Sequence, residues 1–368
     1  MRAHLLLIPD VDLATDASPL RQDLPALEAL RAGGRLRRVQ IANPHGIEPG
    51  QFVPEAAWLG MRGEEGQMAP GPLMVSSLRA DPPGRSTQFV VTPARREGDG
   101  IAELSHALTE ADANALLTIV GRLNTPKWTF LAGISPEFAL VQEEVHGYVC
   151  AAPGDWPGRT WAELMPDGDR VHELRRWIDD AANLLLDCEF NRARVGNGQA
   201  PIDALMPWGN GFRLPTPKLS LRRGQPAWVY SESWRLAGLT RLVGYRHIGR
   251  GMFRSGLQTK FDTFARQTLE KPTTLSVFAP PPAGLAEESQ WWWATWDREF
   301  LAPFCARLLG QPARLLVIVM SGNEGLVLES GLGDRTAVPI GPDAMAAPLP
   351  RVDLADVAED ALRAHDAT

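Results

Sequence analysis

The sequence predicts an α/β protein whose core is a mainly parallel β-sheet flanked by helices, with a small α+β domain inserted into it. Three observations favour this class. Residues 5–8 form a continuous apolar run, which is typical of a strand buried in a parallel sheet. A helical repeat at 24–32 and a second strand at 36–41 follow, in the order of a βαβ unit. From about Pro72, short strands surround one helix, which indicates a separate small domain.

Length and composition are those of a globular protein. A chain of 368 residues, with 44% hydrophobic and 22% charged residues, can bury one large core or two moderate ones. The formal net charge of -7 argues against a general nucleic-acid binder, because no basic stripe is available to neutralise phosphates.

The three cysteines, Cys150, Cys188 and Cys305, lie far apart in the sequence and lack C-x-x-C spacing. Neither a disulfide framework nor a zinc knuckle is therefore expected. The apolar run at 5–8 is too short for a signal peptide or a membrane span, and Asp10 and Asp12 follow it at once. We expect a cytoplasmic protein that does not contact a membrane.

The first predicted elements are the strand at 5–8, a helix at 24–32 that ends at Gly33-Gly34, and the strand at 36–41. Pro49-Gly50 then sets a tight turn that leads into a short apolar helix, so residue 51 stands at the helix entrance. Unpaired backbone N–H groups converge at such a position, which suits a nucleophile or an anion. The residue there is Gln51, whose amide forms hydrogen bonds but cannot carry a phosphoryl or acyl group.

The predicted small domain spans residues 72–154, and the predicted core domain comprises 1–71 and 155–368. In the small domain we expect strands at 74–79 and 88–91, a helix at 109–123 capped by Thr109, and a hairpin from 128–132 and 137–143. The Pro- and Gly-rich stretch 153–158 is the expected return linker. A long helix is expected at 172–194, with one apolar side formed by Leu174, Trp177, Ile178, Ala181, Leu185 and Cys188.

Segment 46–60, G-I-E-P-G-Q-F-V-P-E-A-A-W-L-G, resembles the nucleophile segment of the cofactor-independent phosphoglycerate mutases, in particular the archaeal type, within the alkaline phosphatase superfamily. The family pattern, G-x-x-P-G-S-D-x-A-x-L-x-x-L-G, fits without a gap and places its Ser on Gln51. Asp10 and the helix with Pro25, Leu27 and Leu30 resemble the family's first metal-binding strand end and helix. Later blocks at 201–211, 238–244 and 256–263 agree in order, although Trp208 replaces an expected Arg. The resemblance implies an alkaline phosphatase-like core with an insert after the nucleophile segment.

The resemblance also implies a site for two divalent ions, held by carboxylates and imidazoles, that activate the Ser. Of the family's ligand positions, only the first keeps an acid, Asp10. The other positions hold Pro281, Leu285, Met320, Ser321 and Gly333. The helix pattern at 296–303 keeps the family's form, which supports this register. A solitary carboxylate does not hold a catalytic ion pair, so no metal or other cofactor is expected.

No replacement set of metal ligands stands out in the sequence. The seven histidines show neither H-x-x-x-H nor H-x-E spacing. Five acids could approach one another, but nothing in their spacing requires it: Asp10, Asp12, Asp262, Glu324 and Asp334. Without its partners, Asp10 is more simply a loop carboxylate or a helix cap, and Gln51 more simply bonds its own turn.

Basic residues flank the cleft that the resemblance implies; they are Arg192, Arg194, Arg246, Arg250, Arg254 and Lys260. Arginine binds phosphate or carboxylate bidentately without a metal, so a retained anion site is the sharper interpretation and surface solvation the plainer one. The expected ligand-binding residues are Asp10, Gln51, Arg192, Arg194, Arg254, Lys260 and Asp262.

A tryptophan run, Trp291, Trp292 and Trp293 with Trp296, begins a predicted helix. Trp292 and Trp296 share a face at i and i+4, while Trp291 and Trp293 are expected to point elsewhere. Core packing explains one face. The other tryptophans in the run could cover the cleft or bind a protein partner.

These observations lead to the hypothesis of a catalytically degenerate phosphoglycerate mutase-like protein that binds a small phosphorylated anion or a protein partner. Two alternatives stay open. One is an active metal-dependent 2,3-bisphosphoglycerate-independent phosphoglycerate mutase, or a related phosphohydrolase, with a rearranged site that would carry Mn, Zn or Mg. The other is a structural or assembly subunit, for which the tryptophan run is the only hint.

Overall fold

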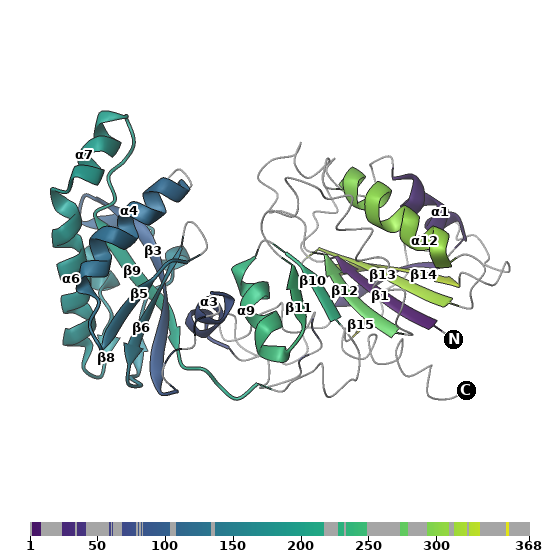
Figure 1. Ribbon diagram of the computed structural model, residues 1–368, viewed down its shortest axis with the longest axis horizontal. Coiled ribbons are helices and arrows are strands. Elements are labelled where there is room, and N and C mark those ends of the chain that lie inside the picture. The colour runs from purple at the N-terminus through teal and green to yellow at the C-terminus, as the bar shows by residue number, and fades with distance from the viewer. Residues whose placement is uncertain are drawn as a thin grey trace. The chain divides into compact units, whose positions relative to one another are not determined.

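The computed structural model (Figure 1) describes residues 2–8, 24–33, 35–41, 59, 61, 68–78, 80, 82, 84–103, 108–133, 137–216, 227–231, 233–248, 273–278, 293–308, 313–321, 324–331 and 351–352. The chain divides into two compact units. The core unit comprises Met1–Gln67 and Thr216–Thr368, and the small unit comprises Met68–Pro215.

The small unit differs from the predicted insert mainly at its second boundary. It begins four residues before 72, but it ends at Pro215 and not at 154. The stretch 153–158 is therefore not the return linker: part of it forms the short helix η3, Pro153–Asp155, inside the small unit. The reason is that strand β9, Ala204–Gly211, pairs with β3, Ser86–Glu97. Because β9 is part of the small unit's sheet, the unit extends to Pro215.

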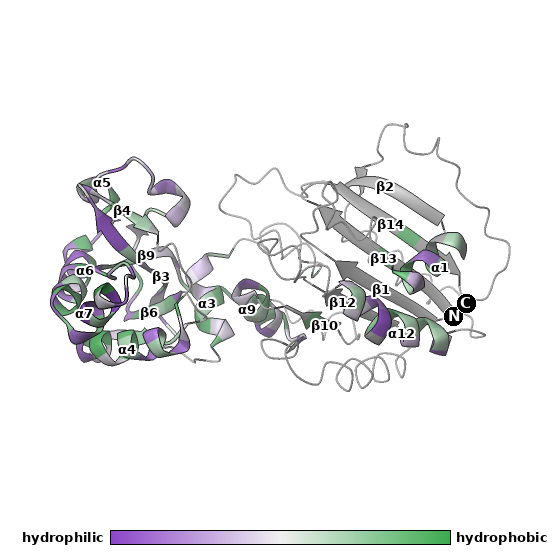
Figure 2. Cartoon of the chain, turned by 90° about the horizontal axis from the view of Figure 1, so that it is seen from above, coloured by the Kyte–Doolittle hydropathy of each residue, from purple (hydrophilic) through white to green (hydrophobic). Residues whose placement is uncertain are grey.

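The described part of the core unit contains an eight-stranded sheet with the strand order β11-β10-β12-β1-β13-β14-β2-β15. Figure 2 shows most of these strands side by side. Their bounds are β1 Arg2–Ile8, β2 Arg35–Ile41, β10 Ala227–Tyr230, β11 Arg246–Ile248, β12 Thr273–Phe278, β13 Ala313–Ser321, β14 Glu324–Gly331 and β15 Arg351–Val352.

The strands from β11 to β13 pair in parallel, in agreement with the predicted parallel sheet. Strand β14 departs from this pattern, because it runs antiparallel to both β13 and β2. Strands β1 and β2 are both formed as predicted, but β13 and β14 lie between them. The first strand, helix and second strand therefore do not make a βαβ unit of adjacent strands.

Helix α1, Pro25–Gly33, and helix α12, Ala302–Leu308, cover one face of this sheet (Figure 1). A π-helical turn, η4, Asp297–Leu301, precedes α12. Helix α9, Trp234–Val243, ends at Gly244, whose φ of 80° is the left-handed conformation that glycine adopts readily at a helix end.

The tryptophan run contributes to the core of this unit. Trp293 and Trp296 are both buried, and their rings meet edge to face with centroids 5.8 Å apart. Phe300 stacks on Trp296, and Phe304 stacks on Phe300. The expectation that Trp293 points away from the packed face is wrong, because the i and i+3 positions share a buried face here. Trp291 and Trp292 lie outside the described residues.

The small unit is a five-stranded antiparallel sheet, ordered β4-β3-β6-β5 with β9 also paired to β3, and packed against helices. Its other strands are β4 Gly100–Glu103, β5 Trp128–Leu131, β6 Phe138–Glu143, and the separate pair β7 Tyr148–Val149 and β8 Asp167–Gly168. Its helices are α3 Pro70–Ser77, α4 Glu110–Val120, η2 Gly121–Leu123, α5 Trp161–Leu164, α6 Val171–Leu186 and α7 Glu189–Gly196.

Several predicted elements of the small unit are confirmed. The hairpin forms from β5 and β6, and the strand predicted at 88–91 is part of β3. Helix α4 has the predicted cap, since the Thr109 side chain accepts from the Asp112 backbone N–H and the Asp112 carboxylate accepts from the Thr109 backbone N–H.

Two predicted elements of the small unit are wrong. The strand expected at 74–79 is helix α3, which begins with prolines and buries residues on every side, so its apolar run carries no helical period. The single helix expected at 172–194 is two helices, α6 and α7. The Asn191 amide holds the break by donating to the carbonyls of Leu185 and Ile202 and accepting the Ile202 N–H.

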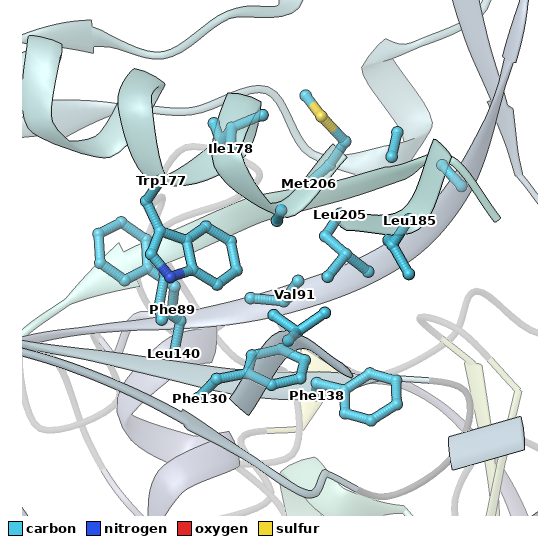
Figure 3. Packing of buried hydrophobic residues seen from close by; sticks show 14 of the residues in the cluster. Phe89, Val91, Phe130, Phe138, Leu140, Trp177, Ile178, Leu185, Leu205 and Met206 are labelled. Carbon is cyan, nitrogen blue, oxygen red and sulfur yellow. The ribbon is translucent and has the colours of Figure 1, made fainter. Parts of the chain in front are cut away.

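The core of the small unit lies between the sheet and α6 (Figure 3). Leu174, Trp177, Ile178, Ala181 and Leu185 are all buried along α6, as the apolar side predicted. Cys188 lies at the start of α7 and is only partly buried. Across both units, none of the described helices has the length and apolar character needed to cross a bilayer.

Candidate functional site

The strongest candidate site in the core unit is the edge of the sheet where β12, β1 and β13 end. These three strands are neighbours and run in parallel, with Leu7 opposite Val277 and Ile8 opposite Val319. Their carboxyl ends therefore lie at the same edge. In open α/β sheets, ligands bind in the crevice beyond this edge.

The sequence connects each of these strand ends to a position of the expected metal site. Asp10 follows the last residue of β1 by two positions, and Pro281 follows the last residue of β12 by three. Met320 and Ser321 are the last two residues of β13. The strand topology thus supports comparing these three chain positions as parts of one site.

Two more strands meet the same edge. Glu324 begins β14 and pairs with Ser321 on one side and with Gln40 on the other. Because β14 is antiparallel to β2, the end of β2 also lies here, and the segment 46–60 follows β2 in the chain. Among the five acids considered in the sequence, Glu324 is thereby placed at this edge.

Most of the expected site residues lie outside the described residues. These are Asp10, Asp12, Gln51, Arg250, Arg254, Lys260, Asp262, Pro281, Leu285, Gly333 and Asp334. Their roles stay predictions.

The residues that the sequence resemblance puts at the family's ligand positions would not fit two hard divalent ions. Proline, leucine and glycine side chains offer no ligand atom, and the thioether of Met320 is a soft one. Hard divalent ions are held by several oxygen or imidazole ligands. In the described part of the chain, no group of three or more His, Cys, Asp or Glu side chains is arranged to hold a metal ion.

The two arginines predicted to bind a ligand on α7 have different environments. Arg194 is buried, and its guanidinium lies 3.1 Å from the Asp112 carboxylate and donates to the Ala200 carbonyl at 3.0 Å. Its charge is therefore engaged inside the small unit. Arg192 is exposed. Both belong to the small unit, whereas Arg246, which is also exposed, belongs to β11 of the core unit.

Two described thiols are unsuited to nucleophilic chemistry. Burial raises the pKa of Cys150 to about 12, and burial together with the Asp297 charge raises the pKa of Cys305 to about 12. At neutral pH neither thiol supplies the reactive thiolate.

Asp297 is a buried carboxylate of the core unit that the sequence analysis did not identify. Asp297 is 3% exposed and accepts the backbone N–H groups of Ala26 and Leu27 at 3.0 and 2.8 Å. These bonds cap the first turn of α1, so Asp297 has a structural role. The contact between Asp297 and Leu27 spans 270 positions of sequence, so no local sequence pattern predicts it.

Comparisons with known proteins agree with this architecture. No protein-family model matches the chain. A curated relative, 2,3-bisphosphoglycerate-independent phosphoglycerate mutase 2 of Methanothermobacter thermautotrophicus, is 23% identical over 306 residues, which cover 78% of this chain and 75% of that protein.

Two solved structures share the fold. The cofactor-independent phosphoglycerate mutase of Thermoplasma acidophilum has a TM-score of 0.62 at 17% identity, covering 99% of this chain and 100% of the other. A protein of Pyrococcus horikoshii has a TM-score of 0.69 at 16% identity, covering 98% and 97%. The chain therefore has the fold of a cofactor-independent phosphoglycerate mutase, an alkaline phosphatase-like α/β architecture, and a distant sequence similarity to such a mutase.

Proposed function

We propose that this phosphoglycerate mutase-like protein is catalytically degenerate and binds a small phosphorylated anion without turning it over. The observation that carries the proposal is the set of residues that the sequence places after β12 and at the end of β13, the two strands that flank β1. Pro281 and Leu285 follow β12, and Met320 and Ser321 close β13. The proposal is that a mutase-like fold is kept while the groups that would bind metal are replaced.

The nucleophile position supports the same proposal. Gln51 stands where the resembling family has its Ser. An amide donates and accepts hydrogen bonds but forms no phosphoryl ester, so the site would bind an anion through N–H groups and not through a covalent intermediate. Arg254 and Lys260, with Asp10 and Asp262, are the proposed ligand-binding residues of the core unit. Arg192, on α7 of the small unit, stays a prediction from the resemblance. Arg194 is a weaker candidate, because its guanidinium is paired with Asp112.

A protein partner at the tryptophan run is less well supported. Trp293 and Trp296 are buried in the core unit and offer no surface to a partner. The surface proposal for this run now depends on Trp291 and Trp292 alone.

Metal content and turnover provide the first test. The full-length protein is purified from medium supplemented with Mn, Zn and Mg, and its metal is measured by elemental mass spectrometry alongside a phosphoglycerate mutase assay and a phosphatase assay. We expect less than stoichiometric metal and no turnover above that of Asp10→Ala. Stoichiometric Mn or Zn with turnover that Asp10→Ala abolishes would instead establish the alternative, an active metal-dependent mutase or phosphohydrolase.

Ligand binding provides the second test. Inorganic phosphate and 3-phosphoglycerate, with glycerate as the unphosphorylated control, are titrated by calorimetry and by thermal unfolding. A ligand that binds only the folded protein stabilises it by about 2.7 kcal/mol at a hundredfold excess over Kd. Arg254→Gln and Lys260→Gln should weaken binding of the phosphorylated compounds. Arg176→Gln, which removes an exposed arginine on α6, should not. Equal binding by all variants, or no binding at all, contradicts the proposed anion site.

A further inference from the structure

The small unit contains buried polar groups that no protein group satisfies. Both amide atoms of Gln142, the hydroxyl of Tyr148 and the indole N–H of Trp177 lack a hydrogen-bond partner. Gln142 is fully buried, and Trp177 and Tyr148 are 4% and 6% exposed. Unpartnered buried polar groups are rare in native proteins, and an ordered water is a frequent explanation.

Strand pairing places Gln142 among residues of one sheet face. Gln142 on β6 lies opposite Trp128 on β5 and opposite Thr87 on β3. Directly opposed residues of antiparallel strands project to the same face. In the next row of that face, Leu140 lies between Phe130 and Phe89.

The side chains of Trp177 and Tyr148 contact aromatic residues of these two rows of the sheet. The Trp177 ring, on α6, stacks on Trp128 with centroids 6.5 Å apart and lies 5.9 Å from Phe130. Figure 3 shows its indole projecting from α6 toward Phe89 and Leu140. The Tyr148 ring packs on Phe89, with centroids 5.7 Å apart. Gln142, Tyr148 and Trp177, which we call the polar cluster, therefore converge between α6 and the sheet.

Reorienting the Gln142 amide exchanges its oxygen and its nitrogen but adds no donor or acceptor to the cluster. Burial raises the pKa of the Tyr148 hydroxyl, and a side-chain interaction with the Gln142 amide lowers it in part, so the two groups lie within reach of each other although neither meets the geometry of a hydrogen bond. Tyr148 keeps its proton at neutral pH and can both donate and accept a hydrogen bond.

We propose that the polar cluster is a binding site for an internal water molecule shared by Gln142, Tyr148 and Trp177. The ligand must accept a hydrogen bond from Trp177, whose indole only donates, and must both donate to and accept from the amide and the hydroxyl. Water does all of this, and buried water usually makes about three hydrogen bonds. All three residues are at most 6% exposed, which favours a small ligand.

The charges nearby disfavour an ion in this place. Glu173, one helical turn before Trp177 on α6, is paired with Lys127 at 2.5 Å, and its carboxylate contributes to the raised pKa of Tyr148. That carboxylate opposes an anion. A cation would face the positive edge of the Trp177 N–H. A neutral molecule with both donors and acceptors remains.

Water contacts at the Trp177 indole proton test the proposal in the full-length, ¹⁵N-labelled protein. Long-lived internal water gives a nuclear Overhauser cross-peak to nearby indole protons. We expect this cross-peak at Trp177, assigned by its loss in Trp177→Phe. Trp156 and Trp208 are matched buried controls, because their indoles donate directly to the Ala151 carbonyl and the Thr92 hydroxyl. A Trp177 proton without a water cross-peak overturns the proposal.

Two variants test whether the cross-peak comes from a bound water and whether Gln142 binds that water. In Tyr148→Phe the cross-peak should persist, because Gln142 and Trp177 still hold the water; its loss would mean that the signal came from the exchanging Tyr148 hydroxyl. In Gln142→Met, which keeps side-chain length but removes the amide, the cross-peak should weaken at least threefold. An unchanged intensity would show that Gln142 does not bind the water. The Trp208 signal reports in each case whether the small unit is still folded.

Discussion

The carboxylate of Asp297 accepts the backbone N–H of Leu27 at 2.8 Å, although the two residues lie 270 positions apart in the sequence. It also accepts the Ala26 N–H at 3.0 Å. These N–H groups belong to the first turn of α1, where a helix has no partners of its own. A side chain from η4 thus supplies the cap of α1 and joins two helices on one face of the core sheet.

We expect Asp297→Ala to weaken the attachment of α1. Loss of a buried cap that makes charge-assisted bonds costs about 2 kcal/mol, equivalent to about thirtyfold faster amide exchange by local opening. Asp297→Asn keeps one acceptor and should cost about half as much. Hydrogen exchange of peptides covering residues 24–33 measures the effect, with small-unit peptides as the internal reference and Asp179→Ala, at an exposed position, as the control. Unchanged exchange in α1 would show that the cap contributes nothing.

The ion pair between Arg194 and Asp112 predicts a pH dependence of the small unit. Burial by itself raises the pKa of Asp112, but hydrogen bonds from Thr109 and the charge of Arg194 outweigh it, so the pKa lies below its ordinary value of 3.8. A depressed folded pKa contributes stability that is present above the unfolded pKa and is lost as pH falls through the folded pKa. We therefore expect the small unit to lose stability as the pH falls below about 4.

Asp112→Asn should flatten this part of the profile, since the amide does not titrate. Thermal unfolding of wild type and variant between about pH 2.5 and 6 makes the comparison. Asp180→Asn, which alters an exposed carboxylate on α6, serves as the control. If the unfolding temperatures of wild type and Asp112→Asn fall equally below pH 4, groups other than Asp112 cause the acid sensitivity.

Local patterns predicted the elements whose formation depends on local physics. The apolar run of β1, the period of α1, the Thr109 cap of α4 and the β5-β6 hairpin are all present. Helix α3 was misread because it is buried on all sides, so its apolar residues show no helical period. The break between α6 and α7 depends on Asn191 bonding Ile202, a contact that helix periodicity cannot show.

The candidate site was predictable only as a set of chain positions. Sequence order does not reveal that β12, β1 and β13 are neighbours, because this depends on pairing between strands hundreds of residues apart. Nor does it reveal that β13 and β14 separate β1 from β2. Arg194 was predicted from its charge to bind an anion, but in the structure it is buried and paired with Asp112.

The close approach of α3 to β3 predicts a strict requirement for glycine at position 71. A Cβ atom at Gly71 would overlap the backbone carbonyl of Gln88, which cannot move without breaking the β3 pairing. Overpacking of this kind typically costs 1–3 kcal/mol, so Gly71→Ala should destabilise the small unit by about 2 kcal/mol. Gly196→Ala is the control, since nothing lies within 4 Å of its Cβ position in α7, and it should be neutral or stabilising. Equal unfolding midpoints in urea would refute the clash.

The raised pKa values of Cys150 and Cys305, which are both partly buried, predict slow alkylation of the native protein. The pKa of each thiol is about 12, against an ordinary value of 9.0, because burial disfavours the thiolate. At pH 8 the thiolate fraction is then lower by about a thousandfold, and only the thiolate reacts with iodoacetamide. Peptide mass spectrometry after timed labelling should show both sites almost unmodified in buffer and rapidly modified in concentrated urea. Cys305 should also react faster in Asp297→Ala, because that variant removes the nearby charge and loosens the attachment of α1, whereas Cys150 in the small unit should not change. Equal acceleration at both cysteines would mean that Asp297 acts on global unfolding and not on its own unit.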